Sequence, residues 1–239
     1  MSAPTSKQKE TFTDPVCGIS LSESTGHPLS VGSKEIQFCG DQCRDRFKSN
    51  PEKFSGEPIL KISNVWKIFG TGEARTEVLK GININVWKGD FVAIIGSSGS
   101  GKSTTLNMVG LLDKPSKGQV LLRGKDIAVL SDDERAKLRS ITFGFVFQQY
   151  NLLPWLTAEE NVKMPLLFSG KILSDEKIHE HFKSVNLENR MDHCPLEMSG
   201  GEQQRTAFLR AVINDPEIIL GDEPTGNLDS ETGNKLLDL

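Results

Sequence analysis

Short apolar runs separated by polar turns mark the strands and helices that this 239-residue chain is expected to form. Strand-like stretches lie near Ile59 to Val65 and Gly81 to Val86, and a solid apolar run, Phe91 to Ile95, suits a strand buried on both faces. A glycine-rich turn follows that run, and a helix is expected from Lys102 to about Leu112. Strand, glycine-rich turn and helix in this order predict an α/β core.

Later helices are expected to begin at capping boxes, in which a serine or threonine and a glutamate three residues further on satisfy each other's backbone amides. The pairs with this spacing are Ser131 with Glu134, Thr157 with Glu160, and Ser199 with Glu202. Near the end of the chain, Ile218 to Leu220 is an apolar strand that leads into Gly221, Asp222 and Glu223.

The start of the chain has a different organisation. The polar leader through Thr13 is expected to be disordered, and Asn50 to Pro58, NPEKFSGEP, separates a short cysteine-rich segment from the rest. Within that segment we expect a hairpin over Leu29 to Phe38, turning at Gly32-Ser33, and a helix over Asp41 to Lys48. Because roughly forty residues bury too little apolar surface for independent stability, a metal ion or contact with the larger domain is expected. The predicted domains are a leader at 1–13, a cysteine-rich domain at 14–56 and a larger domain at 57–239.

Composition excludes some classes of protein. The net charge of -4 and the pI near 5.7 argue against a nucleic-acid partner, which normally faces a basic surface. No window of the sequence approaches the eighteen or so apolar residues of a membrane-spanning helix, and the leader has no apolar signal core. A cytoplasmic location is therefore expected.

A phosphate-binding motif follows the apolar run Phe91 to Ile95. Gly96 to Ser103, GSSGSGKS, matches G-x-x-x-x-G-K-[ST] between an expected strand and an expected helix. The loop lets successive backbone N–H groups face phosphates, while Lys102 can reach the β and γ phosphates and Ser103 can hold Mg²⁺. The backbone groups belong to Gly96, Ser97, Ser98, Gly99, Ser100 and Gly101.

Two further motifs accompany the phosphate loop. Asp222 and Glu223 end an apolar strand, which suits one acid that holds Mg²⁺ and a second that orients the attacking water, although such a pair alone also fits ordinary surface residues. In Glu197 to Arg205, EMSGGEQQR, the bare glycine backbone at a helix start can bind an anion. Because the phosphate loop already serves this chain's own ATP, we expect this helix start to contact a nucleotide held by another copy; the alternative is an ordinary capped helix.

These three motifs in this order resemble the ABC ATPase family across residues 59–239. Gly144 to Val162 and Gly221 to Ser230 resemble the subgroup that serves lipoprotein-release and macrolide-export permeases. The resemblance implies a P-loop NTPase core with a helical subdomain at about 150–212. It also implies a homodimer around two ATP with Mg²⁺, and a separate membrane permease that holds the protein on the inner face of the cell membrane.

The resemblance also implies a role for individual residues. Phe69 would stack on adenine, and the phosphate loop through Thr104 would bind the nucleotide. Gln148 would link Mg²⁺ to the permease contact, Asp222 would hold Mg²⁺, and Glu223 would be the general base. Ser199, Gly200 and Gly201 would clamp the partner subunit's γ-phosphate. Asp229 would lie in a loop that passes between subunits, unless it is a plain turn residue beside Gly226-Asn227.

One departure from the family concerns the end of the chain. The family places a histidine that senses the γ-phosphate a few dozen residues beyond Asp229, whereas this sequence stops at Leu239 inside an apolar-periodic stretch with no helix cap. A C-terminally truncated chain is expected, one that binds ATP but turns it over poorly. The alternatives to a transporter ATPase are a metal-responsive regulator and an inactive fragment.

Three of the four cysteines fall within the first 43 residues, in the pattern C-x21-C-x3-C formed by Cys17, Cys39 and Cys43. This spacing fits a metal site better than a disulfide scaffold, and three thiolates suit Zn²⁺ or Cu(I), with a fourth ligand from Asp14, His27 or water. Cysteines that only pack a small core are the alternative. The segment resembles the YHS/TRASH family of heavy-metal modules, including FxxNPEKF at Phe47 to Phe54.

Overall fold

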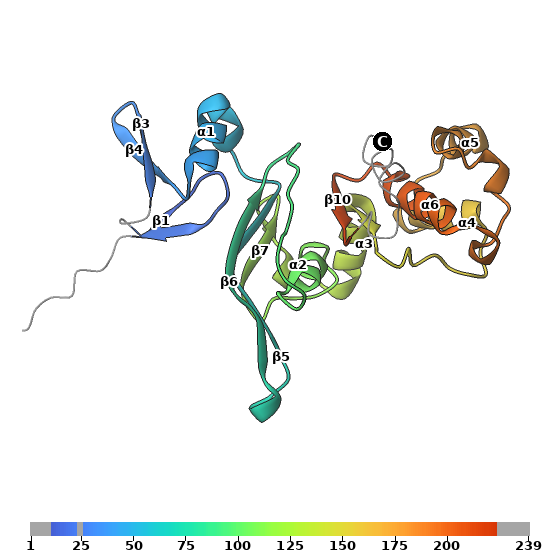
Figure 1. Ribbon diagram of the computed structural model, residues 1–239, viewed down its shortest axis with the longest axis horizontal. Helices are drawn as coiled ribbons and strands as arrows, with labels where there is room; N and C mark the ends of the chain where they lie inside the picture. Colours follow the sequence, from blue (N-terminus) through green and yellow to red (C-terminus); the bar gives the residue numbers. More distant parts are fainter. Residues whose placement is uncertain (1–10, 23–25, 224–239) are drawn as a thin grey trace, which may run out of the picture. The chain divides into compact units, whose positions relative to one another are not determined.

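The computed structural model describes residues 11–22 and 26–223 (Figure 1). The chain divides into two compact units, Met1–Leu130 and Ser131–Leu239, and each is described by itself. The division does not fall near residue 57, where the sequence predicts a domain boundary, because the cysteine-rich segment packs onto the strands that follow it. No helix within the described ranges is long and apolar enough to cross a membrane.

The described residues of the cysteine-rich segment form short strands and one α-helix (Figure 1). The predicted hairpin and helix are confirmed, since β3 (His27–Val31) pairs antiparallel with β4 (Lys34–Phe38) and α1 spans Asp41–Ser49. A 3-10 turn, η1 (Pro51–Phe54), follows the helix. The segment begins earlier than expected, because β1 (Thr11–Thr13) pairs with β2 (Ser20–Ser22); residues 1–10 of the predicted leader lie outside the described residues.

The largest element of the first unit is a four-stranded sheet in the order β6-β5-β7-β8, in which neighbouring strands are antiparallel. The two strands expected near Ile59 and Gly81 are confirmed as the long pair β5 and β6, whose register shifts three times along their length. The remaining elements are two 3-10 turns and the helix α2. The bounds are β5 (Leu60–Phe69), η2 (Gly72–Ala74), β6 (Thr76–Val86), α2 (Lys102–Val109), β7 (Lys117–Leu122), β8 (Lys125–Asp126) and η3 (Ile127–Val129).

The prediction of a buried strand at Phe91 to Ile95 is wrong in this structure. The segment has no strand pairing, and the side chains of Phe91 and Ile95 are each 92% exposed. Apolar composition favours a buried strand but cannot supply the neighbouring backbone that a strand needs for its hydrogen bonds. The helix α2 also ends earlier than predicted, because Leu111 takes a positive φ of 60° directly after Gly110.

Within its described residues, 131–223, the second unit contains a two-stranded parallel sheet and four helices (Figure 1). All three predicted capping boxes are present at the starts of α3, α4 and α6. Helices α4 to α6 share an apolar core built around Val162, Phe182 and Leu209, and they lie within the range predicted for a helical subdomain. The bounds are α3 (Asp132–Thr142), β9 (Phe143–Val146), α4 (Ala158–Ser169), α5 (Asp175–Ser184), η4 (Glu188–Arg190), η5 (Pro195–Glu197), α6 (Gly200–Val212) and β10 (Ile218–Gly221).

Candidate nucleotide site and cysteine cluster

The glycine-rich loop curls around the lysine of its own motif. The Lys102 ammonium donates hydrogen bonds to the carbonyl oxygens of Gly96 at 2.9 Å and Ser97 at 3.1 Å. Gly101 caps α2 in the left-handed region, with φ of 93°, and a Cβ there would lie 2.7 Å from Leu79 on β6. Only glycine meets both requirements, so the loop can seat the start of α2 directly on the sheet. Ser103 and Thr104 follow in the first turn of α2.

Phe69, predicted to stack on adenine, is the last residue of β5. Its side chain is 45% exposed, and the Lys67 ammonium lies over the ring at 4.9 Å from the centroid. Lys67 is held there by an ion pair with Asp113 at 2.6 Å. The ring is thus exposed enough to stack on a planar ligand, and its position is supported by a cation–π contact.

The parallel pairing of β9 and β10 brings two predicted site residues of the second unit together. Gly221 pairs with Val146, so the two strands end at the same edge of the sheet. Gln148 and Glu223 follow these ends directly, and the Gln148 amide donates a hydrogen bond to the Glu223 carboxylate at 2.9 Å. Asp222, directly before Glu223, is half-buried, and its backbone N–H donates to the carbonyl oxygen of Val146 at 3.0 Å.

The start of α6 carries Ser199, Gly200 and Gly201, with Ser199 as the N-cap. The Glu202 carboxylate accepts hydrogen bonds from the Ser199 amide at 2.7 Å and hydroxyl at 2.9 Å, and from Arg190 at 2.7 Å. These bonds, with Arg190 contributing most, lower the pKa of Glu202 to about 2. The capping box is therefore fixed by an ionised carboxylate at neutral pH.

Replacing Glu202 with glutamine is expected to lower the free energy of unfolding of the second unit by about 1 kcal/mol at pH 7, the usual contribution of a helix cap. The pKa of Glu202 is about 2 in the folded state against 4.5 as its ordinary value, so its contribution is complete above about pH 4.5 and is lost as the pH falls toward 2. Urea denaturation at pH 7 and pH 3 checks this, since the difference between variant and wild type should be smaller at pH 3. An equal difference at both values would mean that ionisation of Glu202 is unimportant.

Arg210, which the sequence interpretation passed over, joins α6 to the segment after Gln148. Its guanidinium donates to the carbonyl oxygens of Asn151 at 2.5 Å and Tyr150 at 2.7 Å, and both of these residues have positive φ. Burial lowers the pKa of Arg210. No local sequence signal marks this arginine, because its partners are backbone atoms 59 and 60 positions away.

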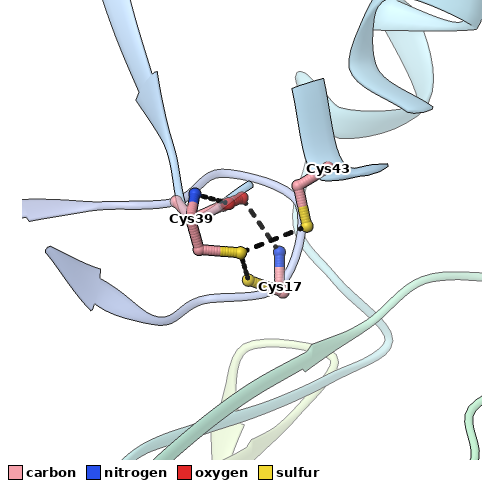
Figure 2. Close-up of side chains that lie close together, drawn as sticks. Cys17, Cys39 and Cys43 are labelled. Atoms are coloured by element: carbon pink, nitrogen blue, oxygen red, sulfur yellow. Dashed lines mark hydrogen bonds between the residues drawn. The ribbon is translucent and has the colours of Figure 1, made fainter. Parts of the chain in front are cut away.

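The three N-terminal cysteines lie together, as predicted (Figure 2). The sulfur of Cys39 lies 3.5 Å from that of Cys17 and 3.6 Å from that of Cys43, and all three are free thiols. Cys17 comes from a loop, Cys39 follows β4, and Cys43 lies in the first turn of α1. Ligand atoms of these cysteines and Asp14 all lie within 4.8 Å of one another.

Asp14 is fully buried and holds the cysteine loops in place. One carboxylate oxygen accepts from the backbone amides of Val16 at 2.7 Å and Cys17 at 3.2 Å, and the other accepts from the amide of Cys39 at 2.7 Å. His27, the other candidate fourth ligand, lies outside the cluster and contacts Asp41 at 3.0 Å. The remaining cysteine, Cys194, belongs to the second unit.

Two thiols of the cluster, those of Cys39 and Cys43, have a raised pKa and resist ionisation. Burial raises the pKa of Cys43 to about 12, and the neighbouring charges of Cys17 and Asp14 add to this effect. Burial, followed by the hydrogen bonds with Asp14 as acceptor and with the other two cysteines, raises the pKa of Cys39 well above its usual range. A bound cation would offset the repulsion between these negative charges and favour the thiolates, which are the form of cysteine that binds metal ions.

Asp229, predicted to lie in a loop between subunits, and the apolar-periodic stretch before Leu239 both lie outside the described residues. A glycine-rich phosphate loop that leads directly into the helix α2 is typical of a nucleotide-binding protein. The family model of ABC transporters matches residues 79–226.

Relatives and solved structures agree with this match. The lipoprotein-releasing system ATP-binding protein LolD of Xylella fastidiosa is 42% identical over 80% of this chain and 80% of its own length. The macrolide export ATP-binding/permease protein MacB of Brucella melitensis is 45% identical over 77% of this chain, which spans only 29% of that relative. A dimeric post-hydrolysis structure of the ATP-binding cassette MJ0796, bound to ADP and Pi, is 46% identical over 75% of this chain and 80% of its own, with a TM-score of 0.70.

The chain belongs to the ABC transporter family, as its ATP-binding cassette. It is an ATPase subunit, of the class that dimerises and drives a membrane permease. The N-terminal cysteine segment precedes the matched residues.

Proposed function

We propose that the chain binds MgATP through the phosphate loop and hydrolyses it with Glu223 as the general base. The observation that supports this most is the hydrogen bond between the Gln148 amide and the Glu223 carboxylate at the common edge of β9 and β10. Ser103, Gln148 and Asp222 offer the hydroxyl, amide and carboxylate oxygens that Mg²⁺ prefers, and bound Mg²⁺ would neutralise charge on the phosphates. Phe69 would stack on adenine, and Gly96 to Thr104 would bind the phosphates.

We further propose that two copies close around two ATP. Ser199, Gly200 and Gly201 would contact the γ-phosphate held by the partner copy, with Asp229 near the subunit boundary. The support is the start of α6, where the bare glycine backbone and the helix dipole favour an anion. Glu202 brings a negative charge to this end of the helix, but its ion pair with Arg190 at 2.7 Å offsets that charge.

We propose a separate membrane permease as the partner, which would hold the chain on the inner face of the cell membrane. The support is the segment after Gln148, where the Asn161 side chain accepts from the amide of Leu153 at 2.7 Å and donates to the carbonyl oxygens of Leu153 and Leu156 at 3.1 Å. Between these anchors, Trp155 is 72% exposed. A large aromatic side chain on a rigid support is typical of the residues that dominate protein interfaces.

Replacing Trp155 with alanine is expected to weaken permease binding by about 2 kcal/mol or more, roughly 30-fold, the loss seen for a tryptophan at the centre of an interface. The measurement is recovery of the integral membrane partner with tagged chain from native membranes, followed by titration of the purified permease. Val129→Ala, which removes a side chain that is 78% exposed in the other unit, is the control. Equal binding by both variants would contradict a permease contact at Trp155.

We also propose that Cys17, Cys39 and Cys43 bind one soft metal ion, Zn²⁺ or Cu(I). Two thiolates bound to one tetrahedral zinc at about 2.3 Å each lie about 3.8 Å apart, close to the sulfur separations of 3.5 and 3.6 Å. Asp14 would support the site rather than complete it, since both of its oxygens accept backbone hydrogen bonds. Water would then take any fourth position.

A further inference from the structure

The cysteine segment and the end of β6 share one buried core. Val16, Phe38, Phe47 and Phe54 pack with Trp87, which directly follows β6 and is 5% exposed. The indole N–H of Trp87 donates to the carbonyl oxygen of Val16 at 2.8 Å, and its ring meets the edge of Phe54 at 5.2 Å between centroids. A segment too short to build its own core thus uses a tryptophan of the following domain.

The loop that carries the first cysteine is also fitted to this strand. The carbonyl oxygen of Cys17 accepts a hydrogen bond from the Asn85 amide at 2.7 Å. Gly18 has a φ of 82°, and a Cβ there would lie 2.8 Å from the Asn85 side-chain oxygen. The position of Cys17 is therefore fixed relative to β6, and the left-handed backbone and close approach at the next residue favour glycine.

A buried carboxylate makes a second connection. Asp90, whose side chain is 3% exposed, accepts from Arg46 at 2.9 Å and Lys53 at 2.6 Å, and its other oxygen accepts from the Trp87 amide at 3.2 Å. Burial tends to raise the pKa of Asp90, but the bonds from Lys53, the Trp87 amide and Arg46 lower it overall. Arg46 lies on α1, three residues after Cys43 and hence on the same side of the helix.

Asp90 is the residue directly before the segment that leads into the phosphate loop. Phe91 to Ile95 has no strand pairing in this structure, so the turn from Trp87 to Asp90, closed by the Asp90 amide on the Trp87 carbonyl oxygen at 2.9 Å, anchors the near end of that segment. The anchor is made largely by Arg46 and Lys53 of the cysteine segment.

We propose that a metal ion at Cys17, Cys39 and Cys43 regulates nucleotide binding at the phosphate loop through α1 and Asp90. The proposal rests on the metal and nucleotide sites proposed above. A bound ion would be coordinated both by Cys17, whose carbonyl oxygen is held by Asn85 of β6, and by Cys43 on α1. It would thereby keep the Arg46 side chain in contact with Asp90. Without the ion, the start of α1 keeps only weak sulfur contacts and the exposed contact between His27 and Asp41, and the anchor before the phosphate loop loosens. Because coupling is reciprocal, ATP strengthens metal binding by the same factor.

The test compares the dissociation constant of MgATP for the whole chain at a buffered free Zn²⁺ concentration and with a chelator. We expect binding at least about fivefold tighter with Zn²⁺, the lower end of typical coupling between sites. The dissociation constant of Zn²⁺, measured with and without MgATP, should change by the same factor. The triple variant Cys17→Ser, Cys39→Ser, Cys43→Ser removes the site and should abolish the response, which separates that response from any direct effect of Zn²⁺ on ATP.

Two variants of α1 test the route. Arg46→Gln should bind Zn²⁺ and MgATP but lose most of the response, whereas Arg44→Gln, whose guanidinium contacts Asp41 and Asp45 instead, should retain it. Absence of Zn²⁺ binding would overturn the metal site, and absence of MgATP binding would overturn the nucleotide site. If both ligands bind but the dissociation constant of MgATP is the same with Zn²⁺ and with a chelator, the coupling alone is overturned. A full response in Arg46→Gln would overturn the route through Asp90.

Discussion

Replacing Glu223 with glutamine is expected to lower the rate of ATP hydrolysis by about 10²- to 10⁴-fold, the usual contribution of a general base, while MgATP still binds. Glutamine has nearly the same shape as glutamate and can still meet the Gln148 amide, which lies 2.9 Å from the Glu223 carboxylate. It cannot take a proton from water. Single-turnover release of phosphate measures the rate of the chemical step, and an equilibrium titration measures the affinity for MgATP.

Asp215→Asn is a suitable control for this experiment. Asp215 is an exposed acid just before β10, and its positive φ of 54° is one that asparagine tolerates. Its removal changes the net charge by the same amount without reaching the end of the strand, so hydrolysis should stay at the wild-type rate. Hydrolysis at the wild-type rate in Glu223→Gln would show that another group activates the water.

Replacing Cys39 with serine is expected to weaken Zn²⁺ binding by far more than 100-fold, whereas Asp14→Asn should weaken it by about 10- to 100-fold. The first variant removes a proposed metal ligand, whose sulfur lies within 3.6 Å of both other sulfurs. The second removes a partner that orients the ligand loops, and losses of that size are typical for such residues. Competition with a chromophoric chelator measures both constants.

The same pair of variants distinguishes a ligand from a supporting residue. Asparagine keeps one oxygen that can accept from the Val16 and Cys17 amides, but its amide group cannot accept from Cys39. The absorption of a Co²⁺ complex provides a second readout, since its intensity at thiolate charge-transfer wavelengths should be unchanged in Asp14→Asn and reduced in Cys39→Ser. Equal losses of affinity and equal spectra in the two variants would contradict these assignments.

Local chemistry explains what the sequence predicts well. The capping boxes of α3, α4 and α6 involve partners three residues apart, so the motif and the structure coincide. The hairpin that turns at Gly32-Ser33 and the phosphate loop are also decided within a few residues. The cysteine cluster was predictable too, although it joins Cys17 to residues 22 and 26 positions away, because thiol spacing carries its own signal.

Contacts between distant segments account for what the sequence does not predict. Asp90 was not singled out, since its partners Arg46 and Lys53 are 44 and 37 positions away and surface lysines and arginines are common. Phe91 to Ile95 was predicted as a strand from composition alone, but pairing depends on which backbone lies beside it. The same reasoning applies to Arg210, whose partners are backbone carbonyl groups.

We propose that this ABC ATPase dimerises around ATP and that its cysteine segment binds a metal ion. Both parts can be checked by the native mass of the Glu223→Gln variant, purified with Zn²⁺ and mixed with MgATP. We expect a dimer that carries two ATP per dimer and one Zn²⁺ per chain. A monomer without nucleotide, or a dimer without Zn²⁺, would contradict it.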